Sequence, residues 1–366
     1  MKKPGNPGTV WYAPGDRVDA CTPELSLVAS MRRLLTLTSG FISLLAAVLL
    51  GTGLGAANCA NADESAAEFL GNRMPYAAFE RLPAARLEVS GAVLTVAFAP
   101  GRLDLPEARV LEWIHSAAHA VAVYYGRFPI SSARILIVPG AGRGVSGGKA
   151  WAYRGAAVRI SVGANSTEAD LARDWILVHE MTHLAFPSVP DAHHWIEEGL
   201  AAYVEAVARA QAGQFSAEKV WGDLAAGLPK GQPQPGDQGL DHTPTWGRTY
   251  WGGALFCLLA DVEIRRRSAN RFGLQHALRA ILTAGNMESS SALEPLLAIG
   301  DRAVGVPVLA RLYAAMKDRP APADLDALWR QLGVRPVVLP AGRGVEFDES
   351  APDASIRRAI TAPLRQ

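Results

Sequence analysis

The feature that most constrains the fold is a pair of histidines four residues apart in an apolar run, His179-Glu180-Met181-Thr182-His183. On an α-helix, residues four apart lie about 40° apart in projection, so both imidazoles can reach a single ion. Glu180 directly follows His179, so its carboxylate lies beside the two ligands. There it can take a proton from a metal-bound water. The motif therefore predicts a helix that carries two metal ligands, His179 and His183, and a catalytic base, Glu180.

A catalytic zinc site needs a third protein ligand and an open position. Residues 186–190 hold two prolines and predict a turn, after which a second helix begins near Trp195. Two helices joined in this way can pack antiparallel and present a carboxylate to the imidazole pair. Glu197 and Glu198 both qualify, but they lie about 100° apart around the helix, so at most one of them can face the ion. Glu205, nearly on the stripe of Glu198, can hydrogen-bond a ligand histidine.

The two segments together, His179-Glu180-x-x-His183 and Trp195-Ile196-x-Glu198-Gly199-Leu200-Ala201, resemble the gluzincin metallopeptidases of the thermolysin-like superfamily. This resemblance implies that Glu198 is the third zinc ligand and that Glu197 is a surface carboxylate. It also implies a zincin catalytic domain of the α+β class, with a β-rich N-terminal lobe before an α-helical lobe, and one Zn²⁺ per chain.

A further segment, Tyr250-Trp251-Gly252-Gly253-Ala254-Leu255, resembles the tyrosine-x-x-glycine-alanine segment of the glycyl aminopeptidase family and its relatives. The resemblance implies that the Tyr250 hydroxyl stabilises the tetrahedral intermediate. It covers about residues 91–282. It departs from the larger related aminopeptidase family at 147–154, where those enzymes carry an amine-binding glutamate and this chain has no acidic residue. The residues after Gly300 are too few for the PDZ-type domain that usually follows.

The hydrophobic pattern predicts a β-rich lobe at residues 63–165, a helical lobe with the zinc site at 166–300, and a C-terminal helical segment at 301–366. In the β-rich lobe we expect a hairpin across Gly91, a helix opened by Pro106 and a buried strand at 133–138. After it we expect helices at 167–185, 193–211, 247–267, 273–284, 307–317 and 324–332.

The first 62 residues resemble an export segment rather than part of the fold. Met31-Arg32-Arg33 precedes an uncharged stretch with an apolar centre, and Ala60-Asn61-Ala62 supplies the small-x-small pattern of a signal-peptidase site. We therefore expect a signal peptide in residues 1–62, with Met31 as an alternative start, and an exported protein that is periplasmic or secreted. The alternative is a membrane anchor formed by residues 34–60, because a helix of about 20 apolar residues spans a bilayer.

Composition excludes several other classes of protein. The chain has 366 residues, 49% of them hydrophobic, which is typical of a globular domain and not of a disordered one. Its formal net charge of +1 lacks the basic surplus of a nucleic-acid-binding protein. Of its 3 cysteines only Cys257 follows the export segment, so we expect a buried free thiol.

The sequence thus predicts a zinc-dependent peptidase that acts on a peptide or protein substrate paired with an edge strand, and contacts a membrane only if the N-terminal segment is retained. One alternative is an exported zinc-containing binding or chaperone-like protein without turnover, and another is a helical protein without metal. A second histidine pair, His115 and His119, lacks an adjacent glutamate, and we interpret it as the edge of an amphipathic helix. We expect His193 and His194 in capping or surface positions.

Overall fold

The computed structural model describes residues 68–69, 73–339 and 342–364. The predicted export segment at 1–62 and the alternative anchor at 34–60 lie outside the described residues. Within the described ranges, no helix combines the length and the apolar character that a membrane crossing requires.

The first half of the described chain forms one mixed five-stranded sheet with strand order β1-β2-β3-β5-β4. β1 and β2 make an antiparallel hairpin across Ser90 and Gly91, which both have positive φ. β2, β3 and β5 run parallel, and β4 returns antiparallel at the edge. The strands are β1 (Ala84–Val89), β2 (Ala92–Phe98), β3 (Ser132–Gly140), β4 (Val145–Trp151) and β5 (Ala157–Gly163).

Helices make up most of the rest. They are α2 (Glu107–Tyr125), α3 (Glu168–Arg173), α4 (Ile176–His183), α5 (His194–Gln211), α6 (Ala217–Gly227), α7 (Gly253–Arg267), α8 (Leu274–Ala284), α9 (Leu293–Val304), α10 (Leu309–Met316), α11 (Leu325–Leu332) and α12 (Ala354–Thr361). Shorter turns are η1 (Tyr76–Glu80), η2 (Asp191–His193), η3 (Leu228–Gly231) and the π-helix η4 (Gly247–Gly252). The predicted α+β class, with a β-rich part before a helical part, is confirmed.

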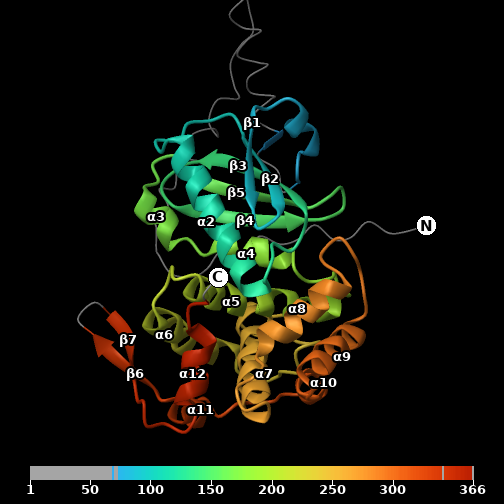
Figure 1. The fold of residues 1–366 in the computed structure, drawn as a ribbon, viewed down its shortest axis with the longest axis vertical. Helices are drawn as coiled ribbons and strands as arrows, with labels where there is room; N and C mark the ends of the chain where they lie inside the picture. Colours follow the sequence, from blue (N-terminus) through green and yellow to red (C-terminus); the bar gives the residue numbers. More distant parts are fainter. Residues whose placement is uncertain (1–67, 70–72, 340–341, 365–366) are drawn as a thin grey trace, which may run out of the picture. The chain divides into compact units, whose positions relative to one another are not determined.

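One large apolar core joins the sheet to the helices. α2 packs on one face of the sheet, and α4 lies between the edge strand β4 and α5 (Figure 1). A smaller cluster on the opposite face includes Ala97, Leu136 and Val138 and is covered by η1. Because α4 is held against the sheet edge, the residues of β4 come within reach of the side chains on α4.

The helix α5 runs through the middle of the helical part and contacts α2, α4 and α7. Its crossing with α7 depends on two glycines. A Cβ at Gly199 would lie 2.3 Å from Gly253 Cα, and a Cβ at Gly253 would lie 2.2 Å from the Trp195 carbonyl oxygen. No side chain fits at either position, so the two backbones touch directly, immediately beside Glu198.

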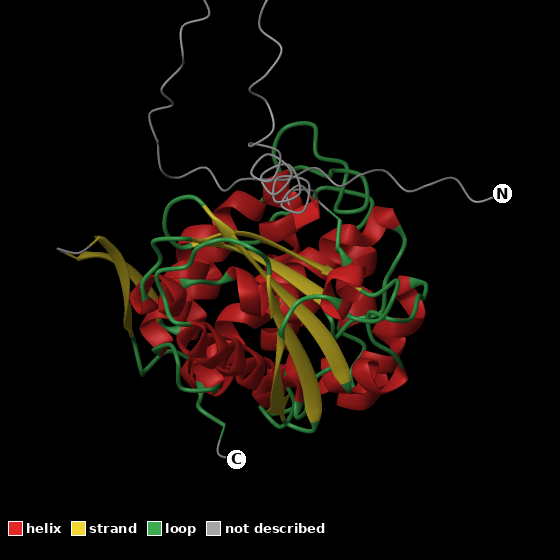
Figure 2. Cartoon of the chain, turned by 90° about the horizontal axis from the view of Figure 1, so that it is seen from above, coloured by secondary structure: helices red, strands yellow, loops and turns green. Residues whose placement is uncertain are grey.

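The structure contains two helices, α6 and α9, that the hydrophobic pattern does not predict, and three of the expected segments take another form. The helix expected at 167–185 is broken into α3 and α4 at Asp174, whose carboxylate binds backbone N–H groups of the second helix. The segment expected at 247–267 begins with a π-helical turn, η4. The C-terminal segment is not wholly helical, because β6 (Val334–Leu339) and β7 (Gly342–Phe347) form an antiparallel hairpin at the edge of the molecule (Figure 2).

Replacing Gly199 with alanine tests the glycine crossing. We expect the free energy of unfolding to fall by about 2 kcal/mol or more, because the new methyl group must push two packed backbones apart. Urea denaturation measures the change. The control is Gly222→Ala on α6, where a Cβ meets open space; it should leave stability unchanged or raise it by up to about 1 kcal/mol, as alanine favours a helix. Equal midpoints for the two variants would contradict the crossing.

Candidate metal centre

The helix α4 is positioned by the cap at its N-terminus. The two carboxylate oxygens of Asp174 accept hydrogen bonds from the backbone N–H groups of Ile176 (2.9 Å) and Leu177 (3.0 Å). These are donors that have no partner within the helix, so the cap defines where α4 begins. From this start, His179 and His183 lie one turn apart on the same face.

The start of α5 is fixed by a second carboxylate, Asp241, which lies in the connection between η3 and η4. It accepts hydrogen bonds from the Trp195 indole N–H (2.7 Å) and the Tyr313 hydroxyl (3.0 Å), and His193 Nδ1 lies 3.1 Å from it. Asp241 thus ties the first turn of α5 to α10. Three residues after Trp195, this turn carries Glu198.

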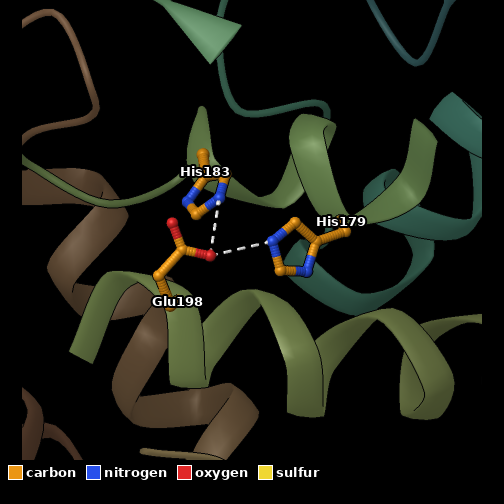
Figure 3. A group of neighbouring side chains, drawn as sticks. All are labelled: His179, His183 and Glu198. Atoms are coloured by element: carbon orange, nitrogen blue, oxygen red, sulfur yellow. Dashed lines mark hydrogen bonds and ion pairs between the residues drawn. The ribbon is translucent and has the colours of Figure 1, made fainter. Parts of the chain in front are cut away.

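His179, His183 and Glu198 converge on one point (Figure 3). Glu198 Oε2 lies 3.1 Å from His179 Nε2 and 3.7 Å from His183 Nε2. One ligand atom from each residue lies within 4.8 Å of the others. Glu197 points elsewhere, since its carboxylate lies 3.2 Å from His194 Nδ1 and accepts from the Val189 N–H. Of the two adjacent glutamates, Glu198 is therefore the one that faces the imidazoles.

These side chains fit a zinc ion. Two imidazole nitrogens and one carboxylate oxygen are the donor set of many catalytic zinc sites. Burial lowers the pKa of His183 to about 4, which keeps it in the neutral form that binds metals. Burial alone would raise the pKa of Glu198, but hydrogen bonds from His179 and His194 hold it well below its usual range, so the carboxylate is ionised. His179 Nδ1 is buried without a hydrogen-bond partner among the described residues.

The carboxylate of Glu180 lies against the edge strand β4. Gly148 allows this contact, because a Cβ there would lie 2.6 Å from Glu180 Cγ and 2.7 Å from Ile176 Cγ2. The Glu180 side chain is buried at this contact. Burial is the largest influence on this group and raises its pKa to about 7. A carboxyl group with a pKa near neutrality can both accept and return a proton.

Tyr250 lies at the same centre, on the π-helical turn η4. Its ring stacks on His179 with centroids 5.9 Å apart and an interplanar angle of 16°. The pKa of its hydroxyl is raised, first by burial and then by the charge of the neighbouring Glu198 carboxylate. The structure therefore brings Tyr250 to the imidazoles and carboxylates as a neutral hydrogen-bond donor.

Glu205 does not make the hydrogen bond to a ligand histidine that the sequence predicts. Its carboxylate instead accepts from Arg209 Nη1 (3.1 Å), four residues along the same helix, because that guanidinium is the nearest buried donor. Burial lowers the pKa of His179, but the adjacent Glu198 outweighs this effect and raises it, and the charge of Glu205 adds to the rise. Burial raises the pKa of Glu205 itself to about 7. Arg209 also donates to the backbone carbonyls of Ala172 and Asp174, which ties α5 to the start of α4.

His194 contacts the centre, although the sequence predicts a capping or surface role for it. Its Nε2 lies 3.2 Å from Glu198 Oε1, the oxygen that does not face the other histidines. Hydrogen bonds to Glu197 and Glu198 raise its pKa to about 10. The spacing of four between His194 and Glu198 is the signal that sequence reasoning missed. His115 and His119 lie on α2, and no third ligand joins them within the described ranges.

No family model matches this sequence, and no curated protein matches it either. Solved structures do resemble it. The aminopeptidase N family protein from Idiomarina loihiensis has a TM-score of 0.51 at 14% identity, over 74% of this chain and 53% of that one. An M1 zinc metallopeptidase from Deinococcus radiodurans has a TM-score of 0.44 at 17% identity, over 66% of this chain and 52% of that one.

This chain spans about half the length of those solved chains. The first likeness confirms the predicted fold class, since the aminopeptidase N family protein shares this α+β architecture over the matched part.

Replacing Arg209 with methionine tests how the centre is supported. We expect the free energy of unfolding to fall by about 3 kcal/mol or more, because Glu205 and two carbonyls lose a buried partner. Urea denaturation of the metal-free protein measures the loss. The control is Arg109→Met on α2, whose ion pairs with Glu112 and Glu168 are exposed and whose loss should change stability little. A similar small effect in both variants would reject the supporting role.

Proposed function

We propose that the chain is a zinc-dependent peptidase in which His179, His183 and Glu198 hold one Zn²⁺. The observation that carries this proposal is the placement of Glu180. Its buried carboxylate lies one residue from a metal-binding set and directly against the edge strand β4. When bound there, a zinc ion lowers the pKa of a coordinated water to ~7 and polarises a carbonyl group.

The residues of this chain supply the remaining chemistry. Glu180 takes a proton from the attacking water and delivers it to the amine of the leaving peptide, which suits its raised pKa. The Tyr250 hydroxyl donates a hydrogen bond to the oxygen on which negative charge develops. Among the described residues β4 is the edge strand of the sheet, so its outer backbone N–H and C=O groups can pair with an extended peptide. The substrate is therefore a peptide or protein chain.

The name of the similar solved structure from Idiomarina loihiensis, an aminopeptidase N family protein, supports a peptide substrate. The formal net charge of +1 lacks the basic surplus of a nucleic-acid-binding protein, so we propose no nucleic-acid partner. We place the enzyme outside the cytoplasm on the basis of the signal-peptide pattern in residues 1–62, with the membrane as a partner only if residues 34–60 are retained as an anchor.

Two substitutions separate metal binding from catalysis. Glu180→Gln should keep about one zinc per chain but reduce peptide hydrolysis by a factor of about 10³ or more, because the amide cannot accept the proton. His183→Ala should lose both zinc and hydrolysis. His119→Ala is the control and should lose neither. Elemental analysis and cleavage of a peptide library measure the two properties.

Zinc well below one per chain in the unsubstituted protein would reject the hydrolase. Zinc without cleavage of any peptide would favour the exported binding or chaperone-like protein instead. Hydrolysis that survives in Glu180→Gln would reject the role of the glutamate as base.

The role of Tyr250 is tested by Tyr250→Phe, which keeps the ring that stacks on His179 and removes only the hydroxyl. We expect kcat to fall by a factor of about 10² to 10³ with little change in KM, since the hydrogen bond forms chiefly in the transition state. Steady-state kinetics and zinc content are measured together. If kcat is unchanged while zinc is retained, Tyr250 serves only to pack against His179.

A further inference from the structure

Trp175 is an exposed tryptophan beside the candidate metal centre. Its exposed fraction is 46%, and only Tyr153 and Val338 are other large hydrophobic residues exposed within the described part of the chain. It belongs to neither apolar cluster of the core. Exposing so large an apolar surface is unfavourable in water, so such a side chain beside a reactive centre is a candidate contact for a ligand.

The position of Trp175 follows from the spacing on α4. Trp175, His179 and His183 are separated by four residues each, so the three side chains follow one stripe of the helix. The ring of Trp175 meets the ring of His179 edge to face, with centroids 5.3 Å apart and an interplanar angle of 89°. Trp175 therefore extends the ligand-bearing face of α4 by one turn towards its N-terminus.

On the other side of His179 the aromatic contacts continue. His179 stacks on Tyr250, and Tyr250 stacks on Trp246 with ring centroids 6.0 Å apart. Four rings thus follow one another across the centre, from Trp175 through His179 and Tyr250 to Trp246.

The acidic neighbours of Trp175 are already engaged. Asp174 is occupied by the backbone N–H groups of Ile176 and Leu177, and the Glu180 side chain is buried against Gly148 of β4. The accessible surface at the N-terminal end of α4 is therefore the apolar aromatic ring of Trp175. An extended peptide on the outer edge of β4 projects alternate side chains to opposite faces of the sheet. Ile176, the residue after Trp175, lies against Gly148 of β4, so Trp175 is placed at the start of α4 beside this strand.

We propose that Trp175 binds an aromatic or large aliphatic side chain of the substrate, at the residue that flanks the scissile bond on the side of the α4 N-terminus. The proposal deepens the proposed function and rests on it. Trp175 selects the substrate by contact with its side chain and takes no part in proton transfer. Peptides with a phenylalanine or leucine at this position are preferred over peptides with alanine.

The first measurement is cleavage by the zinc-loaded full chain of two peptides that differ only in phenylalanine or alanine beside the scissile bond. We expect kcat/KM to favour the phenylalanine peptide by about tenfold or more, as burial of an aromatic side chain on another ring provides. Trp175→Ala should abolish this preference, and Trp175→Phe should largely retain it. Tyr153→Ala, a matched loss of an exposed aromatic ring, should leave the preference intact.

The second measurement does not depend on turnover. Calorimetric binding of the same two peptides is compared in zinc-loaded Glu180→Gln and in Glu180→Gln combined with Trp175→Ala, after zinc content is checked in each. We expect tighter binding of the phenylalanine peptide only where Trp175 is present.

The two measurements distinguish the two ideas. Cleavage or binding that ignores the phenylalanine, or a preference that survives in Trp175→Ala with full zinc content, overturns the role of Trp175. Binding that depends on Trp175 in a protein that cleaves no peptide supports the subsite and rejects the peptidase.

Discussion

The buried carboxylate of Glu198 is the constraint on which the rest of the centre depends. An ionised carboxylate away from water is costly unless cationic groups and hydrogen-bond donors surround it. Here His179 and His194, whose pKa values are raised, lie against the two oxygens, and Tyr250 stacks on His179. These partners come from three separate segments of the chain. The contacts that stabilise the Glu198 carboxylate therefore fix α4, the first turn of α5 and η4 relative to one another.

That arrangement requires close backbones. Tyr250 can reach Glu198 only if the turn that carries it lies against α5, and the contact between Gly199 and Gly253 makes this possible. The π-helical geometry of η4 places Tyr250 just before this contact. Extra residues in a helical turn are often found at functional sites, where they redirect a side chain. Gly148 plays the equivalent part at β4, where it lets the strand approach Glu180.

The spacing of residues along the sequence predicts which side chains share a face of one helix. How the helices are rotated and paired depends on tertiary contacts that the spacing does not contain. His179, Glu180 and His183 follow from the period of α4, and their convergence needs no other information. The choice between Glu197 and Glu198 depends on how α5 is rotated, which spacing alone does not contain. The spacing predicts that Glu205 hydrogen-bonds a ligand histidine, because Glu205 lies nearly on the same face of α5 as Glu198. In the structure, Arg209 donates a hydrogen bond to its carboxylate instead. Trp175 fits the four-residue spacing equally well, and its importance appears only once its exposure is known.

The surroundings of the N-terminal end of α4 show why polar contacts are important for the position of this helix. An open pocket of about 300 Å³ lies beside the segment that leads into α4, lined in part by Ala172, Asp174 and Arg209. The apolar side chains of α4 itself are buried in the core, whereas this segment borders the pocket and is held chiefly by polar contacts. Arg209 compensates by binding the carbonyls of Ala172 and Asp174 on the segment that leads into α4, while Asp174 caps the helix itself. The position of the two ligand histidines thus depends on directional hydrogen bonds, which tolerate displacement less than apolar contacts do.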